Sequence, residues 1–229
     1  MKVLIVYAHH EPKSFTASLK NLAVETLTAQ GHEVKVSDLY AMNFKSIADR
    51  DDFTELDDPN YMNYLLQQKS ASAKKIFTPD ILEEQAKVAW ADFILFHFPV
   101  WWFSAPAILK GWFDRVFAAG FAWDFGKIYA QGVLRGKKAL VAVTTGGPLQ
   151  LYQPNGAHRA TIVQMLHPII HGTLHFCGLD VLPPFVAYAV FIVGDEGRKK
   201  YLEQYQERLR DIENTEPLLL HPPLNEIGK

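Results

Sequence analysis

Tyr152 and His158 lie six residues apart in a polar segment that contains glycine. A phenol donates a hydrogen bond, and an imidazole titrates near neutral pH. Together the two groups are suited to stabilising negative charge that develops on a ring as it is reduced. Taken singly, each is more often an ordinary surface residue. Their position shortly after the polar turn 144–147 favours a catalytic interpretation of the pair.

Three consecutive aromatic residues, Trp101, Trp102 and Phe103, separate an apolar run from an amphipathic segment within the stretch 98–117. Aromatic faces at the carboxyl end of a buried strand form a shelf on which a planar ring stacks. Open α/β sheets hold their ligands in the crevice at that edge. The stretch therefore predicts a site for a flat cofactor.

The segment after the first apolar run leads into a helix and carries His9, Ser14, Thr16 and Ser18. Doubly wound folds bind phosphate at this position, through backbone N–H groups and hydroxyls, and His9 adds a candidate cation. The segment has neither a G-x-G-x-x-G nor a Walker pattern, which argues against an ordinary dinucleotide or P-loop site. Capping of the helix by Ser14 or Thr16, with the histidines on the surface, explains the same residues.

The residues Thr144, Thr145, Gly146 and Gly147 follow a later apolar run. Two hydroxyls and two glycines let the backbone approach a ring edge or a pyrophosphate closely. A plain turn accounts for the same composition. Both interpretations place this segment at the end of a strand.

The spacing of His171 and His175 puts both imidazoles on one face of an expected helix, within reach of one metal ion. Two ligands are too few for a tight site, and only His221 or water would add to them. We therefore favour a packing role and predict no metal site.

Trp123 and Phe125 could line a pocket, although aromatic residues at alternate positions are more often part of the hydrophobic core.

The bulk composition limits the classes of function. The 229 residues are 48% hydrophobic and 13% aromatic, which suits one large core. A net charge of −2 gives no basic field for nucleic acid, so we expect small-molecule partners. We predict a cytoplasmic protein for three reasons. The chain has a single cysteine and no signal-peptide layout, and no apolar run approaches the roughly 20 residues that a membrane span needs.

Short apolar runs alternate with helical patterns along the chain, which is typical of a parallel sheet covered on both faces. The expected strands are 3–8, 34–37, 93–98, 139–144 and 181–190, and the expected helices are 18–30, 79–91, 106–119, 161–177 and 195–212. This order predicts an α/β protein of the flavodoxin-like, doubly wound class, with a five-stranded parallel sheet and helices on both faces.

We expect one catalytic domain over residues 1–215 and a short C-terminal tail over 216–229. The polar stretch 40–77 is too long for an ordinary connection, and we interpret it as a functional excursion or a partner contact. Prolines keep the tail from forming a regular helix. Its leucines need cover from the body or from a second subunit.

At several of these positions the chain resembles the NAD(P)H:quinone oxidoreductase family, the dimeric FAD-containing quinone reductases. The matching stretches extend over nearly the whole chain and include the following: Ser37-Asp-Leu-Tyr-Ala-Met-Asn-Phe44, Pro106-Ala-Ile-Leu-Lys-Gly-Trp-Phe113, Thr144-Thr-Gly-Gly147 and Leu174-His-Phe-Cys-Gly178. The resemblance implies a two-electron reductase that passes hydride from a reduced nicotinamide to a quinone by a ping-pong mechanism. A regulatory flavoprotein of the same fold and an FMN-dependent azoreductase are the alternatives.

The resemblance also implies roles for individual residues. The FAD diphosphate and adenosine side would meet His9, Ser14, Phe15, Thr16, Ser18 and Arg198. The isoalloxazine would meet Pro99, Val100, Trp101, Trp102, Phe103, Thr144, Thr145, Gly146, Gly147 and Tyr152, and Asn63 would reach it from the other subunit. Tyr152 and His158 correspond to the charge-stabilising pair. The quinone and nicotinamide pocket would be lined by Trp123, Asp124, Phe125 and Phe176, some from the partner of a homodimer.

The chain departs from the family at positions that affect its choice of substrate. Trp123 and Phe125 stand where the family often has tyrosine, and Trp101 replaces a smaller or more polar residue. The length is like that of the shorter branch, which uses dihydronicotinamide riboside. That branch has a metal site on the equivalents of His171 and His175, but it has asparagine where this chain has His158. NADH, NADPH and dihydronicotinamide riboside all remain candidate donors.

Overall fold

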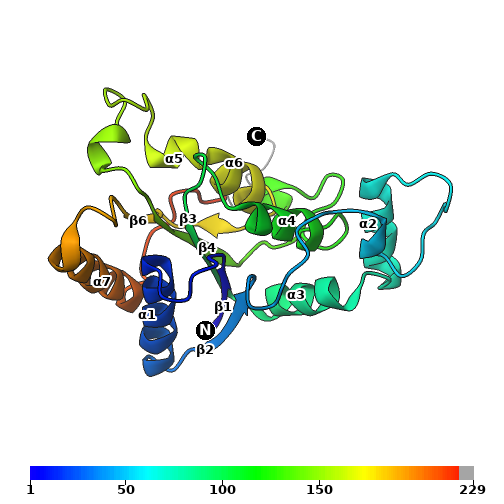
Figure 1. Ribbon diagram of the computed structural model, residues 1–229. Coiled ribbons are helices and arrows are strands. Elements are labelled where there is room, and N and C mark those ends of the chain that lie inside the picture. The colour runs from blue at the N-terminus through cyan, green and yellow to red at the C-terminus, as the bar shows by residue number, and fades with distance from the viewer. Residues whose placement is uncertain (222–229) are drawn as a thin grey trace.

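The structure, a computed structural model, describes residues 1–221 as an open sheet between two layers of helices (Figure 1). The strands are β1 (Lys2–Tyr7), β2 (Glu33–Asp38), β3 (Phe93–Pro99), β4 (Lys138–Thr144), β5 (Asp180–Val181) and β6 (Phe185–Ala187). The order is β2-β1-β3-β4-β5, with β6 also paired to β4, and every pairing is parallel. The predicted flavodoxin-like sheet is confirmed.

The hydrophobic pattern of the central strands matches burial on both faces. All seven residues of β3 are buried. In β1, Val3 and Ile5 join the core on one face, whereas Leu4 and Val6 join the core on the other. Continuous apolar runs are what a parallel sheet needs when helices cover both of its faces.

The last expected strand, 181–190, is interrupted. β5 pairs with the start of β4 and β6 with its end, so the two short strands share one edge of the sheet. Between them lie Pro183 and Pro184, which have no backbone N–H to donate to the ladder. The sheet therefore has six strands where five were expected, because the last expected strand is divided into β5 and β6.

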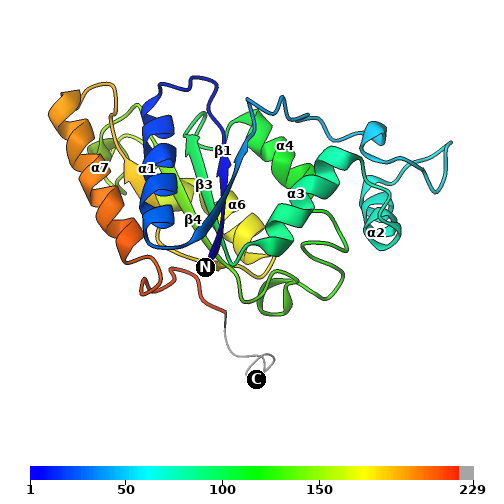
Figure 2. The same cartoon turned by 90° about the horizontal axis from the view of Figure 1, so that it is seen from below.

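The helices divide between the two faces (Figures 1 and 2). One face carries α1 (Phe15–Ala29) and α7 (Gly194–Arg210), which pack against each other. The opposite face carries α3 (Pro79–Trp90), α4 (Ala107–Val116), α5 (Ile162–Met165) and α6 (His167–Ile169). The helix expected over 161–177 is broken: α5 ends before Leu166, and a π-helical segment, Ile170–His175, follows α6. Pro168 has no N–H to donate to the Gln164 carbonyl and its ring crowds that carbonyl, so α5 does not continue through it; Pro168 instead lies in the first turn of α6.

The excursion 40–77 is ordered and contains α2 (Tyr64–Lys74), which lies beyond α3 and α4 at the edge of the molecule (Figure 2). It has a hydrophobic cluster of its own, formed by Phe53, Ala71 and Phe77 with Ile81 and Ala118 of the main body. The excursion is therefore packed against the domain by apolar contacts.

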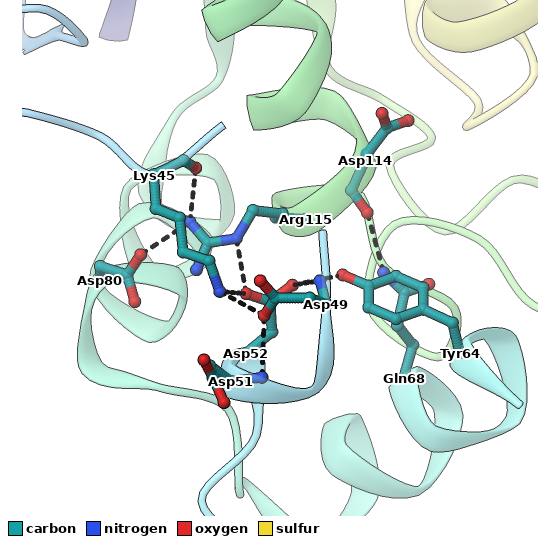
Figure 3. Close-up of polar contacts among 9 residues, drawn as sticks. All are labelled: Lys45, Asp49, Asp51, Asp52, Tyr64, Gln68, Asp80, Asp114 and Arg115. Carbon is teal, nitrogen blue, oxygen red and sulfur yellow. Dashed lines mark hydrogen bonds and ion pairs between the residues drawn. The ribbon is translucent and has the colours of Figure 1, made fainter. Parts of the chain in front are cut away.

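A buried ionic network also fastens the excursion (Figure 3). The Asp52 carboxylate, which is fully buried, accepts hydrogen bonds from Arg115 Nε at 2.9 Å, Lys45 Nζ at 3.0 Å, Tyr64 Oη at 2.7 Å and the Asp49 amide at 3.1 Å. Four donors fill the capacity of its two oxygens. This saturation offsets the cost of removing the charge from water.

Arg115 extends the network to two further segments. Its Nη1 donates to Asp80 Oδ2 at 2.7 Å and to the Lys45 carbonyl at 2.9 Å. Figure 3 shows the guanidinium between these acceptors and Asp52. One side chain of α4 thus joins the excursion to the first turn of α3.

The tail lies partly against the body. Leu219 forms an antiparallel bridge with Val181 and packs on the core, whereas Leu218 and Leu220 are exposed. The part of the predicted tail beyond His221 lies outside the described residues. Across residues 1–221, no helix combines the length and the apolar character that crossing a membrane requires.

We expect Arg115→Met to destabilise the protein by about 3–5 kcal/mol, because it leaves the buried Asp52 carboxylate with a single cationic partner. Urea unfolding measures the loss. Lys110→Ala is the control. Like Arg115, Lys110 is a cation of α4 that pairs with an aspartate, here Asp114, but the Lys110 side chain is 65% exposed. That pair is worth less than about 1 kcal/mol. Equal losses in the two variants would contradict the assignment.

A second buried polar pair joins the sheet to α7. His97 of β3 and Tyr205 of α7 are both fully buried, and His97 Nε2 lies 2.8 Å from Tyr205 Oη. Burial, with a smaller contribution from Lys20, lowers the pKa of His97 to about 3. Because the unfolded chain takes up this proton near pH 6.5, protonation favours unfolding between these two values.

The His97 site should make the protein less stable as the pH falls below about 6.5, by about 1.4 kcal/mol per pH unit, until the folded pKa is reached. His97→Gln keeps a hydrogen-bonding group toward Tyr205 but does not titrate. We expect a smaller loss of stability between pH 7 and pH 5 in this variant, as measured by urea unfolding. An unchanged pH dependence would show that His97 is not the group responsible.

Candidate functional site

A cleft of about 600 Å³ opens at the carboxyl ends of β1, β3 and β4. Strands β2 and β3 lie on opposite sides of β1, so the chain reverses direction across the sheet here, as at the ligand sites of open α/β sheets. Most of the predicted flavin-binding residues meet in this cleft: His9, Ser14, Phe15, Thr16, Pro99, Val100, Trp101, Thr144, Thr145, Gly146 and Arg198. The fold thus brings together residues from four distant segments.

The hydroxyls at the start of α1 already have protein partners. Ser14 Oγ accepts the Ala17 amide at 3.1 Å and so caps the helix. Thr16 Oγ1 and Thr144 Oγ1 lie 2.9 Å apart in a buried contact that joins α1 to the end of β4. Ser18 lines a smaller hollow next to the cleft. Helix capping and a position in the ligand cleft therefore coexist at Ser14.

The positive charges in the cleft come from Lys13 and Arg198. Arg198 Nη1 donates to the Val190 carbonyl at 3.0 Å, and its other terminal nitrogen pairs with Asp195. Burial, followed by the neighbouring His10, lowers the pKa of His9, so its imidazole is neutral near pH 7. His9 therefore acts as a neutral hydrogen-bonding group in the cleft, where Lys13 and Arg198 carry positive charge.

The aromatic stretch forms a tight hairpin. The backbones of Trp101 and Ser104 exchange two hydrogen bonds of 3.0 Å, and the turn residues Trp102 and Phe103 have φ values of 49° and 60°. Two successive left-handed residues make the turn that the twist of a hairpin favours, but non-glycine side chains adopt this conformation at a cost. Trp102 is 95% exposed. The strained turn thus presents its rings outward beside the cleft, into which only Trp101 reaches directly.

Tyr152 and His158 lie together, as predicted, and His158 contacts this hairpin. Their ring centroids are 4.9 Å apart, and the His158 ring meets Phe103 edge-on at 5.0 Å. A Cβ placed on Gly147 would lie 3.4 Å from the Tyr152 ring and 3.0 Å from Leu151. Gly147 therefore allows the Tyr152 ring to pack closely against the turn that follows β4.

The predicted substrate residues lie elsewhere. Trp123 and Phe176, whose ring centroids are 5.6 Å apart, line a separate cavity of about 430 Å³ together with Tyr64 of the excursion. Beside them, Asp124 pairs with Lys69 Nζ at 2.8 Å, and that nitrogen lies 4.9 Å from the centre of the exposed Phe125 ring. Within this chain these residues do not line the cleft.

Asn63 also lies outside the cleft. Its Oδ1 accepts the Leu66 amide at 3.2 Å and caps α2. Within this chain its side chain thus has a structural role at the start of the excursion helix.

The histidines 171 and 175 are neighbours, with centroids 5.6 Å apart, and His221 stacks on His175 at 3.8 Å. Burial lowers the pKa of His175 to about 4. Over residues 1–221, no group of three or more histidine, cysteine or carboxylate side chains has the arrangement that would hold a metal ion.

The cleft is also lined by His10, Lys13 and Phe191, which the sequence did not predict as site residues. His10 and Lys13 belong to the segment predicted to bind phosphate, so their position was a usable signal. Phe191 lies in the loop between β6 and α7, where no motif of the sequence indicates a site.

Comparison with known proteins identifies the family of the chain. A family model described as flavodoxin-like fold matches residues 1–211. The chain is 48% identical to the ribosyldihydronicotinamide dehydrogenase [quinone] of Mus musculus over 97% of this chain and 96% of that protein. It is 41% identical to the NAD(P)H dehydrogenase [quinone] 1 of Rattus norvegicus over 96% of this chain and 81% of that protein.

Among solved structures, a candidate quinone reductase from Klebsiella pneumoniae superposes with a TM-score of 0.91 and 42% identity over 95% of this chain and 87% of that one. The resemblance inferred from the sequence is confirmed. The chain belongs to the flavodoxin-like family of the NAD(P)H and ribosyldihydronicotinamide quinone dehydrogenases.

Proposed function

We propose that the protein is an FAD-dependent two-electron reductase that transfers hydride from a reduced nicotinamide to quinones by a ping-pong mechanism. The observation that carries this proposal is the contact of His158 with Phe103 of the strained aromatic hairpin and with Tyr152, next to the cleft at the end of the sheet. A planar ring beside Trp101 would lie close to a phenol and an imidazole. The quinone dehydrogenases among its relatives support the choice of substrates.

The shape and charge of the cleft favour FAD over FMN. Aromatic residues from distant segments line it, namely Trp101 of the hairpin, Phe15 of α1 and Phe191, and its cations are Lys13 and Arg198. A dinucleotide has two rings joined by a diphosphate, so it would use both the aromatic surfaces and the charges. FMN has one ring and would leave some of them without a partner.

FAD held in this cleft would supply the hydride-transfer chemistry, and a single pocket that serves both substrates would require the oxidised nicotinamide to leave before the quinone enters. Tyr152 would donate a hydrogen bond to the ring as negative charge develops on it. His158 would hold or supply a proton at the same edge. The packing of Tyr152 on Gly147 and of His158 on Phe103 fixes both groups before substrate binds.

The proposal includes a homodimer located in the cytoplasm. Trp123 and Phe176 line a cavity separate from the cleft, so they would meet a substrate only in the cleft of a second copy. The exposed Phe125, Leu218 and Leu220 offer apolar surface for such a partner. Asn63 lies in the excursion, from which the cross-subunit flavin contact would come.

The decisive experiment identifies the flavin and the donor. Heating the purified protein releases the cofactor, and chromatography distinguishes FAD from FMN. Menadione is then offered with NADH, NADPH or dihydronicotinamide riboside. We expect FAD and menadione reduction with at least one donor. FMN without quinone reduction would overturn the proposal, and FMN with azo-dye reduction would favour an azoreductase.

The double variant Tyr152→Phe, His158→Gln should retain flavin but reduce it about 100-fold more slowly, because removing a preorganised donor to developing charge costs on this order. Stopped-flow absorbance with a reduced nicotinamide measures the rate. His32→Gln, next to the start of β2 and so at the opposite edge of the sheet from the cleft, is the control and should react like the wild type. An unchanged rate in the double variant would rule out the charge-stabilising role.

A further inference from the structure

Phe191 is 86% exposed, although its side chain belongs to the cleft. Only Trp102 of the predicted cofactor shelf is more exposed among the large apolar side chains described. Single exposed apolar residues are common on protein surfaces, but one that lines a ligand cleft is in position to be covered by the ligand.

Hydrogen bonds from two different elements hold the loop that carries Phe191. The Ala189 amide donates to the Gly147 carbonyl at 3.0 Å, and the Val190 amide donates to the Thr145 carbonyl at 3.2 Å. Arg198 donates to the Val190 carbonyl. The backbone next to Phe191 is thus bonded both to the turn after β4 and to α7. These bonds fix the position from which the Phe191 side chain extends at the cleft.

The surroundings of Phe191 differ from those of the hairpin. Trp101 has the imidazoles of His9 and His10 as neighbours, with ring centroids 6.3 Å and 6.0 Å away. Phe191 follows the residue that Arg198 holds, and Arg198 shares a second hollow with Phe15 and Lys13. Arg198 thus connects the Phe191 loop to the side of the cleft that carries Phe15 and Lys13, whereas Trp101 lies beside the two histidines.

We infer that Phe191 stacks on the adenine ring of FAD and makes the cleft select FAD over FMN. The inference rests on the proposed flavin site and assigns its specificity to a residue of the β6–α7 loop. An adenine is flat and electron-poor enough to stack on a phenyl ring, and Arg198 would lie near the adjoining phosphates. FMN has no second ring to reach Phe191.

The test titrates the flavin-free protein with FAD and, separately, with FMN, and follows flavin fluorescence. Phe191→Ala should weaken FAD binding about 10-fold, the order seen when an aromatic stacking partner of a base is removed. FMN binding should change less than about 2-fold in the same variant. Phe191→Trp, which keeps an aromatic face, should restore FAD binding.

Ile192→Ala is the matched control, because Ile192 is the next residue and is 73% exposed but does not line the cleft. It should bind both flavins like the wild type. Equal weakening of FAD and FMN by Phe191→Ala, or no weakening of either, would overturn the inference, as would a wild type that binds the two flavins equally. Tight FAD binding without quinone reduction would instead overturn the proposed function and leave the role of Phe191 standing.

Discussion

The parallel pairing of β3 with β1 on one side and β4 on the other is the constraint on which the site depends. The register places Tyr7 opposite His97 and Pro99 opposite Thr144. Each ladder continues one step past the strands, with Ala8 bonded to His97 and Val100 bonded to Thr144, both at 2.9 Å. A one-residue slip would reverse the faces of all buried side chains. The loops that line the cleft therefore begin at strand ends whose positions are set by the register of the sheet.

Fixed strand ends alone would leave the loops free, and three local devices order them. Thr16 and Thr144 share a buried hydrogen bond, the hairpin after β3 closes on itself, and the turn after β4 holds the β6–α7 loop through Thr145 and Gly147. Side chains held in this way need little rearrangement when a ligand binds. The left-handed residues Trp102 and Phe103 show that part of the folding energy is used for this order.

The sequence predicted what depends on local pattern. Continuous apolar runs identified β1, β3 and β4, and Pro79 and Gly31 marked helix boundaries correctly. Helix α2 was missed because its mean hydropathy is low and its sequence has no clear apolar stripe. The break at Pro168 was missed because the pattern on either side of it reads as one helix. Packing of the excursion against the main body decides the first case, and the missing N–H of Pro168 decides the second.

Within the site, most of the residues predicted to bind flavin lie in one cleft because the ends of parallel strands must meet at one edge. The sequence could not show that Thr16 bonds Thr144, 128 residues away, since such a pair depends on the sheet order. Nor could it show that Trp123 and Phe176 line a different cavity. That separation depends on the excursion, whose Tyr64 forms one wall of the cavity and also donates to Asp52.

The ionic network therefore has a consequence beyond stability. Arg115 and Asp52 hold the start of α2, and α2 in turn holds the segment that carries the aromatic residues of the second cavity: Gln68 donates to the Asp114 carbonyl at 2.9 Å and Ser72 to the Ala119 carbonyl at 2.7 Å. If a second copy supplies these aromatic residues to the cleft, their positions are set by a charge cluster buried in that copy. The shape of each substrate pocket would then depend on the folding of both chains.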